Sequence, residues 1–267
     1  MDIKSVYHSY LVHLESKRER TKNKFHASSA GSCFRKQMYS YYDFPQDTKD
    51  DKSYRVLRLG TIVHEDIENA LIHYGQQTHD GRIYIEHEVE IEPLNLVGTF
   101  DVGEMIKDRG NITFNLYDIK TAALFTWSKK FAREIINRDP KVDMNYKMQL
   151  GTYALAMNEK HDLDKINMYL VWYRKNDSFV RETIVNNNWI DKALEYWTEV
   201  NEILEEHGKM FEKELIPGVY PSVPPESGYD KHGINWNCRY CQYYNICPST
   251  FAGKNKRWGN NGRNNFK

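Results

Sequence analysis

A stretch of alternating apolar and polar residues, followed by two further strand-like stretches, constrains the fold of this chain more than any other feature. They cover residues 83–91, 96–106 and 112–120, and turn residues that include Pro93 and Asn95 separate them. Side chains of a strand point alternately to its two faces, so a two-residue period is typical of a strand with one buried face. We therefore expect three consecutive strands connected by short turns.

Helical periodicity surrounds these strands, because apolar residues recur there every three or four positions. The sequence predicts helices at residues 1–20, 33–42, 54–74, 126–137, 143–159 and 189–213, and two more strands at 166–174 and 179–185. The polar stretch 46–52 is expected to be a loop. This order predicts an α/β fold with a mixed central sheet flanked by helices.

The composition is that of an ordinary globular protein, with 267 residues, 40% hydrophobic and 28% charged. No apolar run is long enough to cross a bilayer, and the N-terminal segment lacks the apolar core of a secretory signal. We therefore expect a cytoplasmic protein without a membrane segment. The net charge is zero, so only local basic clusters favour a nucleic-acid partner: residues 17–24, the group Lys129, Lys130 and Arg133, and the tail 254–267.

A carboxylate and a lysine end the third predicted strand on its buried face. Ile112, Phe114, Leu116, Asp118 and Lys120 share one side of that strand because its side chains alternate. Charged groups that continue an apolar face need a compensating partner. A divalent cation is one such partner, since Mg²⁺ and Mn²⁺ prefer carboxylate oxygens and a neighbouring lysine can hold or activate a water. A simple ion pair at the strand end is the alternative interpretation.

Two elements upstream supply further candidate ligands. Asp101 lies on the preceding strand, where an antiparallel hairpin can bring it beside Asp118, although the sequence leaves the register open. Gly98 would allow a close approach of backbone or ligand. On the predicted helix 54–74, His64 and Glu68 lie one turn apart on the same face, and an imidazole is a reasonable further ligand for the cation.

Gln149 and Tyr153 are spaced four residues apart on the predicted helix 143–159, so they share one face. Both side chains can hydrogen-bond a phosphate or a base edge, while ordinary helix packing is the alternative. Taken with the residues above, they complete four motifs in a fixed order: Gly60-x-x-x-His64, Gly98-x-x-Asp101, Asp118-x-Lys120 and Gln149-x-x-x-Tyr153.

This arrangement resembles the RecB-like nucleases of the PD-(D/E)xK type, which have a restriction-endonuclease-like core. The resemblance implies a metal site formed by His64, Asp101, Asp118 and the backbone carbonyl of Ile119. It implies that Asp101, Asp118 and Lys120 are catalytic, with Lys120 orienting or activating water, and that Gln149 and Tyr153 bind the substrate strand. Phe100 replaces the proline of the family motif, and Asp118 replaces the commoner glutamate.

The four cysteines form an uneven pattern, with Cys33 far upstream of the triplet Cys238, Cys241 and Cys247. Thiolates in this spacing suit an iron–sulfur cluster or zinc, and disulfides are not expected in the cytoplasm. The one-plus-three pattern resembles the CRISPR-associated and phage iron–sulfur exonucleases of the RecB-like class. That resemblance implies a 4Fe-4S cluster acting as a C-terminal staple, which closes a very long loop.

The sequence thus predicts a helical region at 1–53, a nuclease core at 54–215, a cluster region at 216–250 and a basic tail at 251–267. We expect a DNA nuclease that uses Mg²⁺ or Mn²⁺, by resemblance an exonuclease on single-stranded DNA or DNA ends. Recombination, replication or repair proteins are candidate partners, and an oligomer is compatible with the sequence. A non-catalytic DNA-binding subunit with this fold and a redox-sensing iron–sulfur protein are the alternatives. Cleavage polarity and strand preference are not encoded in any recognisable motif.

Overall fold

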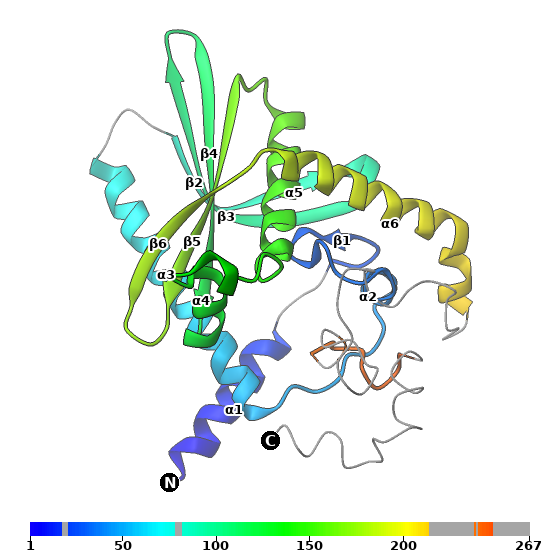
Figure 1. Cartoon of the computed structure of the whole chain (residues 1–267). Helices are drawn as coiled ribbons and strands as arrows, with labels where there is room; N and C mark the ends of the chain where they lie inside the picture. Colours follow the sequence, from blue (N-terminus) through cyan, green and yellow to red (C-terminus); the bar gives the residue numbers. More distant parts are fainter. Residues whose placement is uncertain (18–20, 78–81, 214–237, 239, 248–267) are drawn as a thin grey trace. The chain divides into compact units, whose positions relative to one another are not determined.

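The structure is a computed structural model that describes residues 1–17, 21–77, 82–213, 238 and 240–247 (Figure 1). The chain divides into two compact units. The first contains Met1–Arg20, His26–Gly31 and Asp50–Thr198, and the second contains Thr21–Phe25, Ser32–Lys49 and the described residues from Glu199 onward. The predicted tail 251–267 and most of the predicted cluster region 216–250 lie outside the described residues.

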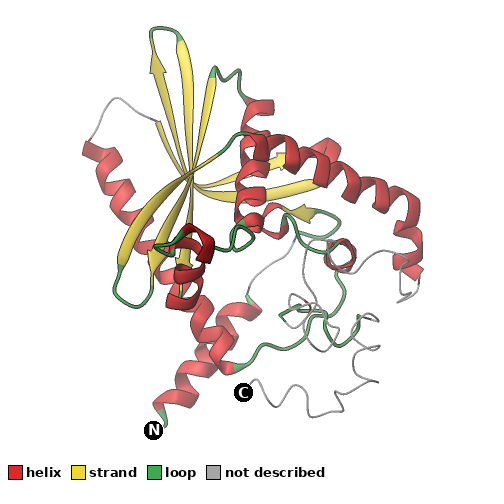
Figure 2. Cartoon of the chain, in the orientation of Figure 1, coloured by secondary structure: helices red, strands yellow, loops and turns green. Residues whose placement is uncertain are grey.

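A mixed sheet is the centre of the first unit (Figure 2). Its strands follow the order β1-β3-β4-β5-β6, and β2 also pairs with β3. The meander β2–β3–β4 is antiparallel, β4 and β5 are parallel, and β6 is antiparallel to β5. The bounds are Phe25–His26 for β1, Arg82–Ile91 for β2, Leu96–Asp108 for β3, Asn111–Ala122 for β4, Lys165–Arg174 for β5 and Phe179–Val185 for β6. The predicted mixed α/β fold is therefore confirmed, and the predicted strands match closely.

Six α-helices are present in the described part of the chain. They are α1 (Ile3–Ser16), α2 (Phe34–Tyr41), α3 (Asp51–Gln77), α4 (Leu124–Phe131), α5 (Met144–Lys160) and α6 (Asn188–Lys213). The expected loop at 46–52 ends earlier than predicted, because Asp50 caps α3 by accepting a hydrogen bond from the backbone N–H of Ser53 at 2.7 Å.

The predicted helix 126–137 is wrong in its second half. The helix α4 ends at Phe131, and only a 3₁₀ turn, Ile135–Asn137, follows. Trp127 is buried, so the first half packs against the core. Ile135 and Ile136 are 77% and 90% exposed, so their apolar side chains meet no core that would hold a continued helix.

Helices pack on both faces of the sheet (Figure 1). One face carries the main core, in which the α5 residues Leu150, Tyr153 and Met157 pack against Phe114 and Leu116 of β4. These α5 positions are spaced three or four residues apart, as one apolar helix face requires. On the other face, side chains of α3 pack against a smaller cluster made by Val102, Ile119 and Val171. The buried face predicted for the third strand is confirmed at Phe114 and Leu116.

The second unit joins α2 to the short segment 240–247. The Tyr39 ring packs at a tilt against the Tyr243 ring, with ring centroids 5.3 Å apart, and both side chains are buried. The backbone N–H of Asp47 donates to the carbonyl of Gln242 at 2.7 Å. Among the described helices, none has both the length and the apolar character that a membrane span requires.

Candidate active site

Asp118 is a carboxylate residue of the sheet whose side chain is fully buried. The Nζ atom of Lys120 lies 2.7 Å from its Oδ2, while Oδ1 has no hydrogen-bond partner among the described residues. Burial raises the pKa of Asp118 to about 7, and the charge of Lys120 only partly offsets this effect. A buried carboxylate oxygen without a partner is costly unless a cation is supplied.

Asp101 reaches Asp118 through an interruption of the strand pairing. The β3–β4 ladder ends at Val102 opposite Tyr117, so Asp101 comes one residue beyond its last pair. There Oδ2 of Asp101 accepts a hydrogen bond from the backbone N–H of Ile119 at 2.6 Å. The carboxylate therefore satisfies a β4 donor that β3 no longer reaches. The register that the sequence left open thus brings the two aspartates together.

The β2–β3 ladder is interrupted at the same level. Ile85 pairs with Val102 and His87 with Phe100, but Glu86 and Asp101 between them do not pair. Glu86 has a φ of 47°, a left-handed conformation that is uncommon for a residue with a side chain. Such strained backbone positions are concentrated at functional sites.

His64 and Glu68 approach the aspartates from α3. The Nδ1 atom of His64 lies 3.6 Å from Oδ1 of Asp101. Burial would lower the pKa of His64, but the hydrogen bond to Asp101 and its negative charge outweigh burial and raise it. Burial, followed by a hydrogen bond to Glu86 and its charge, raises the pKa of Glu68 to about 7. The site therefore contains four carboxyl groups and is short of positive charge.

Lys120 is held between the acidic cluster and an aromatic ring. Its side chain is 16% exposed, and its Nζ lies 5.2 Å from the centroid of the Tyr146 ring. Burial would lower the pKa of Lys120, but the charges of Asp118 and Asp101 outweigh burial and raise it. The lysine is thus an ammonium group at neutral pH, able to donate hydrogen bonds to a water or to a phosphoryl oxygen.

Gln149 and Tyr153 lie inside the core rather than on an open surface. The Nε2 atom of Gln149 donates to the phenol oxygen of Tyr153 at 3.0 Å, and both residues are buried. Burial and the charge of Asp118 raise the pKa of Tyr153, so it remains a neutral phenol. Two side chains, rather than the expected backbone or ligand, lie close to Gly98, because a Cβ there would lie 2.7 Å from the Ala27 side chain and 2.9 Å from the Tyr153 ring.

The described residues do not form a ready-made cation site. No group of three or more His, Cys, Asp or Glu side chains within them is arranged to hold a metal ion. His64, Asp101 and Asp118 are nevertheless neighbours, and they offer the nitrogen and oxygen donors that suit Mg²⁺ or Mn²⁺. The unpartnered Oδ1 of Asp118 is the observation in favour of a cation in this cluster.

A protein-family model described as the PD-(D/E)XK nuclease superfamily matches residues 7–248. The match covers most of the chain and includes every motif residue described above. The chain belongs to the PD-(D/E)XK nuclease superfamily. A comparison with curated protein sequences found no significant match.

Three solved structures resemble this PD-(D/E)XK protein to different degrees. The crystal structure of SSO0001 is 18% identical with a TM-score of 0.51, and the alignment covers 94% of this chain and 98% of that one. An alkaline exonuclease from Laribacter hongkongensis is 11% identical with a TM-score of 0.45, over 72% and 92% of the two chains. A structure from Eubacterium rectale is 15% identical with a TM-score of 0.46, over 72% and 83% of the two chains. Because all three identities are low, these likenesses concern the fold alone. Only the first structure has a TM-score high enough to support an inference about the fold.

The four cysteines of this PD-(D/E)XK chain all lie in the second compact unit, and none forms a disulfide. Cys33 packs against Cys238, and the guanidinium of Arg35 donates to Sγ of Cys247 at 3.6 Å. The backbone N–H of Cys241 donates to the carbonyl of Cys238 at 3.2 Å, which makes a tight turn. Burial raises the pKa of Cys33 to about 12 and that of Cys238 to about 11. Buried thiols of this kind become thiolates only with a compensating cation.

Sequence reasoning missed two groups beside the PD-(D/E)XK motifs. Glu86 is exposed and lies in the middle of an ordinary alternating stretch, so nothing in the pattern marks its left-handed backbone. Tyr146 lies three residues before Gln149 and therefore on the same helix face, which is a signal that could have found it.

Proposed function

We propose that this chain is a metal-dependent DNA nuclease that hydrolyses phosphodiester bonds, acting as an exonuclease on single-stranded DNA or DNA ends. One observation carries the proposal: the fully buried Asp118 has an unpartnered oxygen beside the Lys120 ammonium in a PD-(D/E)XK chain. A structural ion pair would have no use for this extra, unsatisfied oxygen.

His64, Asp101, Asp118 and the backbone carbonyl of Ile119 are the proposed cation ligands. The three side chains are half-buried or buried, and they offer hard oxygen and imidazole donors. When bound, Mg²⁺ or Mn²⁺ would polarise the scissile phosphate and lower the pKa of the attacking water. Hydrolysis of this kind requires no covalent bond between the enzyme and the DNA.

Each remaining group has a proposed task of its own. Asp101 fixes the end of β4 through Ile119 and thereby orients Asp118 for the cation. Lys120, an ammonium held by Asp118, donates to the attacking water or to a phosphoryl oxygen. Of the pair Gln149 and Tyr153, Gln149 contacts the substrate strand through its amide oxygen, and the buried Tyr153 holds the Gln149 side chain in place.

We propose further that Cys33, Cys238, Cys241 and Cys247 bind a 4Fe-4S cluster. Their presence in one compact unit and the Arg35 donor beside Cys247 support this assignment. The cluster would act as a staple in a RecB-like nuclease of the iron–sulfur type, since hydrolysis transfers no electrons. A cytoplasmic location and recombination, replication or repair partners belong to the same proposal.

The test is digestion of 5′-labelled and 3′-labelled DNA, single-stranded and double-stranded, linear and circular, with Mg²⁺ and with Mn²⁺. We expect release of short products from linear single strands, no cleavage with EDTA, and slow or no cleavage of circles. Cleavage of circles as fast as linear strands would refute exonuclease action but not the nuclease. No cleavage of any DNA with either cation would refute the proposed function.

A further inference from the structure

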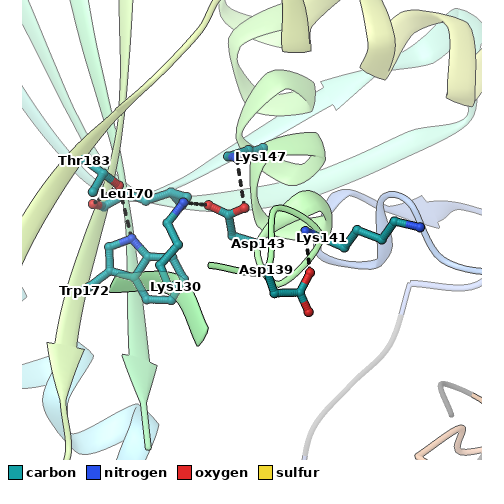
Figure 3. Close-up of polar contacts among 8 residues, drawn as sticks. All are labelled: Lys130, Asp139, Lys141, Asp143, Lys147, Leu170, Trp172 and Thr183. Carbon is teal, nitrogen blue, oxygen red and sulfur yellow. Dashed lines mark hydrogen bonds and ion pairs between the residues drawn. The ribbon is translucent and has the colours of Figure 1, made fainter. Parts of the chain in front are cut away.

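A second buried carboxylate, Asp143, lies where the chain enters α5. An aspartate at a helix N-terminus ordinarily caps its own helix, but this side chain makes no capping hydrogen bond. Its Oδ1 instead lies 2.9 Å from Nζ of Lys147, and its Oδ2 pairs with Nζ of Lys130. Figure 3 shows the two lysines, one from α4 and one from α5, pointing at the same carboxylate.

The charges in this cluster do not cancel. Two ammonium groups share one carboxylate, so the cluster of Lys130, Asp143 and Lys147 carries a net positive charge. The side chain of Asp143 is fully buried, while those of Lys130 and Lys147 are 19% and 22% exposed. Each ammonium has three N–H donors; Lys130 donates one of them to Asp143 and Lys147 forms only an ion pair with it, so donors remain. Because the carboxylate already holds both lysines in place, an anion that binds them loses little further side-chain entropy.

The cluster lies close to the candidate active site. Tyr146, which precedes Lys147 in α5, is the ring that lies 5.2 Å from Nζ of Lys120. The same ring packs edge-on against Trp172, with centroids 5.8 Å apart. Trp172 in turn pairs with Lys120 in the β4–β5 ladder. Tyr146 therefore links the helix that carries Lys147 to the proposed catalytic lysine.

The segment that leads from β4 to the cluster is basic and exposes large apolar side chains. Between Leu124 and Lys147 there are six lysines and arginines but three acids, in a chain whose net charge is zero. Phe125, Ile135 and Ile136 are 73%, 77% and 90% exposed. The Nζ of Lys129 lies 5.8 Å from the centroid of the Phe125 ring. Apolar groups exposed beside cations are typical of surfaces that bind a partner.

We propose that the segment from Leu124 to Lys147 is the docking surface for a single DNA strand on its way to the active site. In this arrangement Lys130 and Lys147 contact a backbone phosphate, and Phe125, Ile135 and Ile136 contact bases. The inference rests on the proposed nuclease function and assigns the strand-binding surface to it. The occupant is a single strand because its bases are free to stack on apolar side chains, whereas a duplex covers them.

The experiment measures the affinity of the full-length protein for a short fluorescein-labelled oligothymidylate in EDTA, where hydrolysis cannot interfere. The main variant combines Lys130→Gln, Asp143→Asn and Lys147→Gln, which removes both ammonium groups without leaving a buried charge unpaired. We expect binding to weaken about tenfold or more. The dependence of log affinity on log salt should become shallower by about 0.7, since the two lysines contact one phosphate and each single-strand phosphate contact contributes about 0.7.

Three further variants keep the inference testable. Lys107→Gln removes an exposed lysine at the far end of the β3–β4 hairpin and should leave affinity unchanged. Lys129→Gln with Arg133→Gln changes only exposed side chains and should weaken binding about threefold even if the triple variant fails to fold. Ile135→Ser with Ile136→Ser should weaken single-strand binding and leave duplex binding unchanged.

The outcomes separate the two proposals. Wild-type protein that binds no DNA would overturn both the docking surface and the nuclease function. Wild-type protein that binds and cleaves DNA, with the triple variant or the Lys129 and Arg133 variant binding equally well, would overturn the docking surface alone. If the isoleucine variant converts a dimer to a monomer and keeps its DNA affinity, the apolar part contacts a second copy of the chain and the inference fails.

Discussion

Two buried carboxylates of the same compact unit, Asp118 and Asp143, differ in how their negative charge is compensated. Asp143 meets two lysines, and each of its oxygens has an ion-pair partner, although Oδ1 makes no hydrogen bond among the described residues. Asp118 meets one lysine, has one unpartnered oxygen, and shares its surroundings with Asp101. The first site has an excess of positive charge and the second an excess of negative charge. The ratio of charges thus distinguishes a site that attracts an anion from one that attracts a cation.

The largest expected effect is on catalysis at the negative site. Asp118→Ala and Lys120→Ala should each reduce DNA cleavage by at least about a thousandfold, because both groups act on the reacting phosphate. Cleavage rates with saturating Mg²⁺ or Mn²⁺ test this, with DNA binding in EDTA as the check that the fold is intact. Near-normal turnover in either variant would show that the substituted residue is not catalytic.

The sequence alone predicted Asp118 and Lys120 as candidate site residues, but it did not predict the difference between Asp118 and Asp143. Alternation located β4 and its buried face, so Asp118 and Lys120 were found from spacing. Asp143 looked like an ordinary residue at a helix start, because pairing with Lys130 depends on how α4 packs. The end of α4 at Phe131 was also hidden, since the apolar period of Ile135 and Ile136 gives no sign that they face solvent. A local sequence pattern predicts which face of a strand or helix is buried, whereas the ion-pair partner of a side chain depends on tertiary packing.

The next largest expected effect is on stability and concerns the compact unit that contains the four cysteines. Cys241→Ser should remove a ligand of the proposed cluster and cost about 4 kcal/mol of stability, by analogy with the loop closure of a disulfide. We expect a lower thermal midpoint and aggregation, with the cleavage rate per folded molecule unchanged. Iron analysis of anaerobically purified wild-type protein should give about four irons per chain. Stoichiometric zinc without iron, or a variant that melts normally but is inactive, would refute the staple.

The third prediction compares the stability change when each buried aspartate, Asp143 or Asp118, is replaced by asparagine. Asp143→Asn should destabilise the protein by about 3 kcal/mol, because two lysines lose their shared buried partner. Asp118→Asn should leave the stability of the metal-free protein unchanged or slightly higher, because burial already disfavours its charged form. Denaturant melts of both variants in EDTA measure the difference. Equal destabilisation would mean that Asp118 is as well satisfied as Asp143.

The smallest effect concerns the exposed Glu86 beside the negative site. The pKa of Glu68 is raised in the folded protein, from an ordinary 4.5 to about 7, by burial and then by Glu86. A group with a raised folded pKa stabilises the protein below its unfolded value, and that stability is lost as the pH rises through its folded value. The thermal midpoint of the metal-free protein should therefore fall between pH 4.5 and 7. Glu86→Gln should reduce this fall by roughly 2 °C, and an unchanged pH profile would show that the two carboxyl groups are not coupled.

The most direct measurement is a Mn²⁺ titration followed by electron paramagnetic resonance, in which binding weakens the signal of free Mn²⁺. Wild-type protein and the Lys107→Gln control should each bind Mn²⁺, and Asp118→Asn should lose that binding while keeping its thermal midpoint in EDTA. This result would show that the unpartnered carboxylate oxygen holds the cation. Binding of Mn²⁺ by Asp118→Asn at wild-type affinity would contradict it.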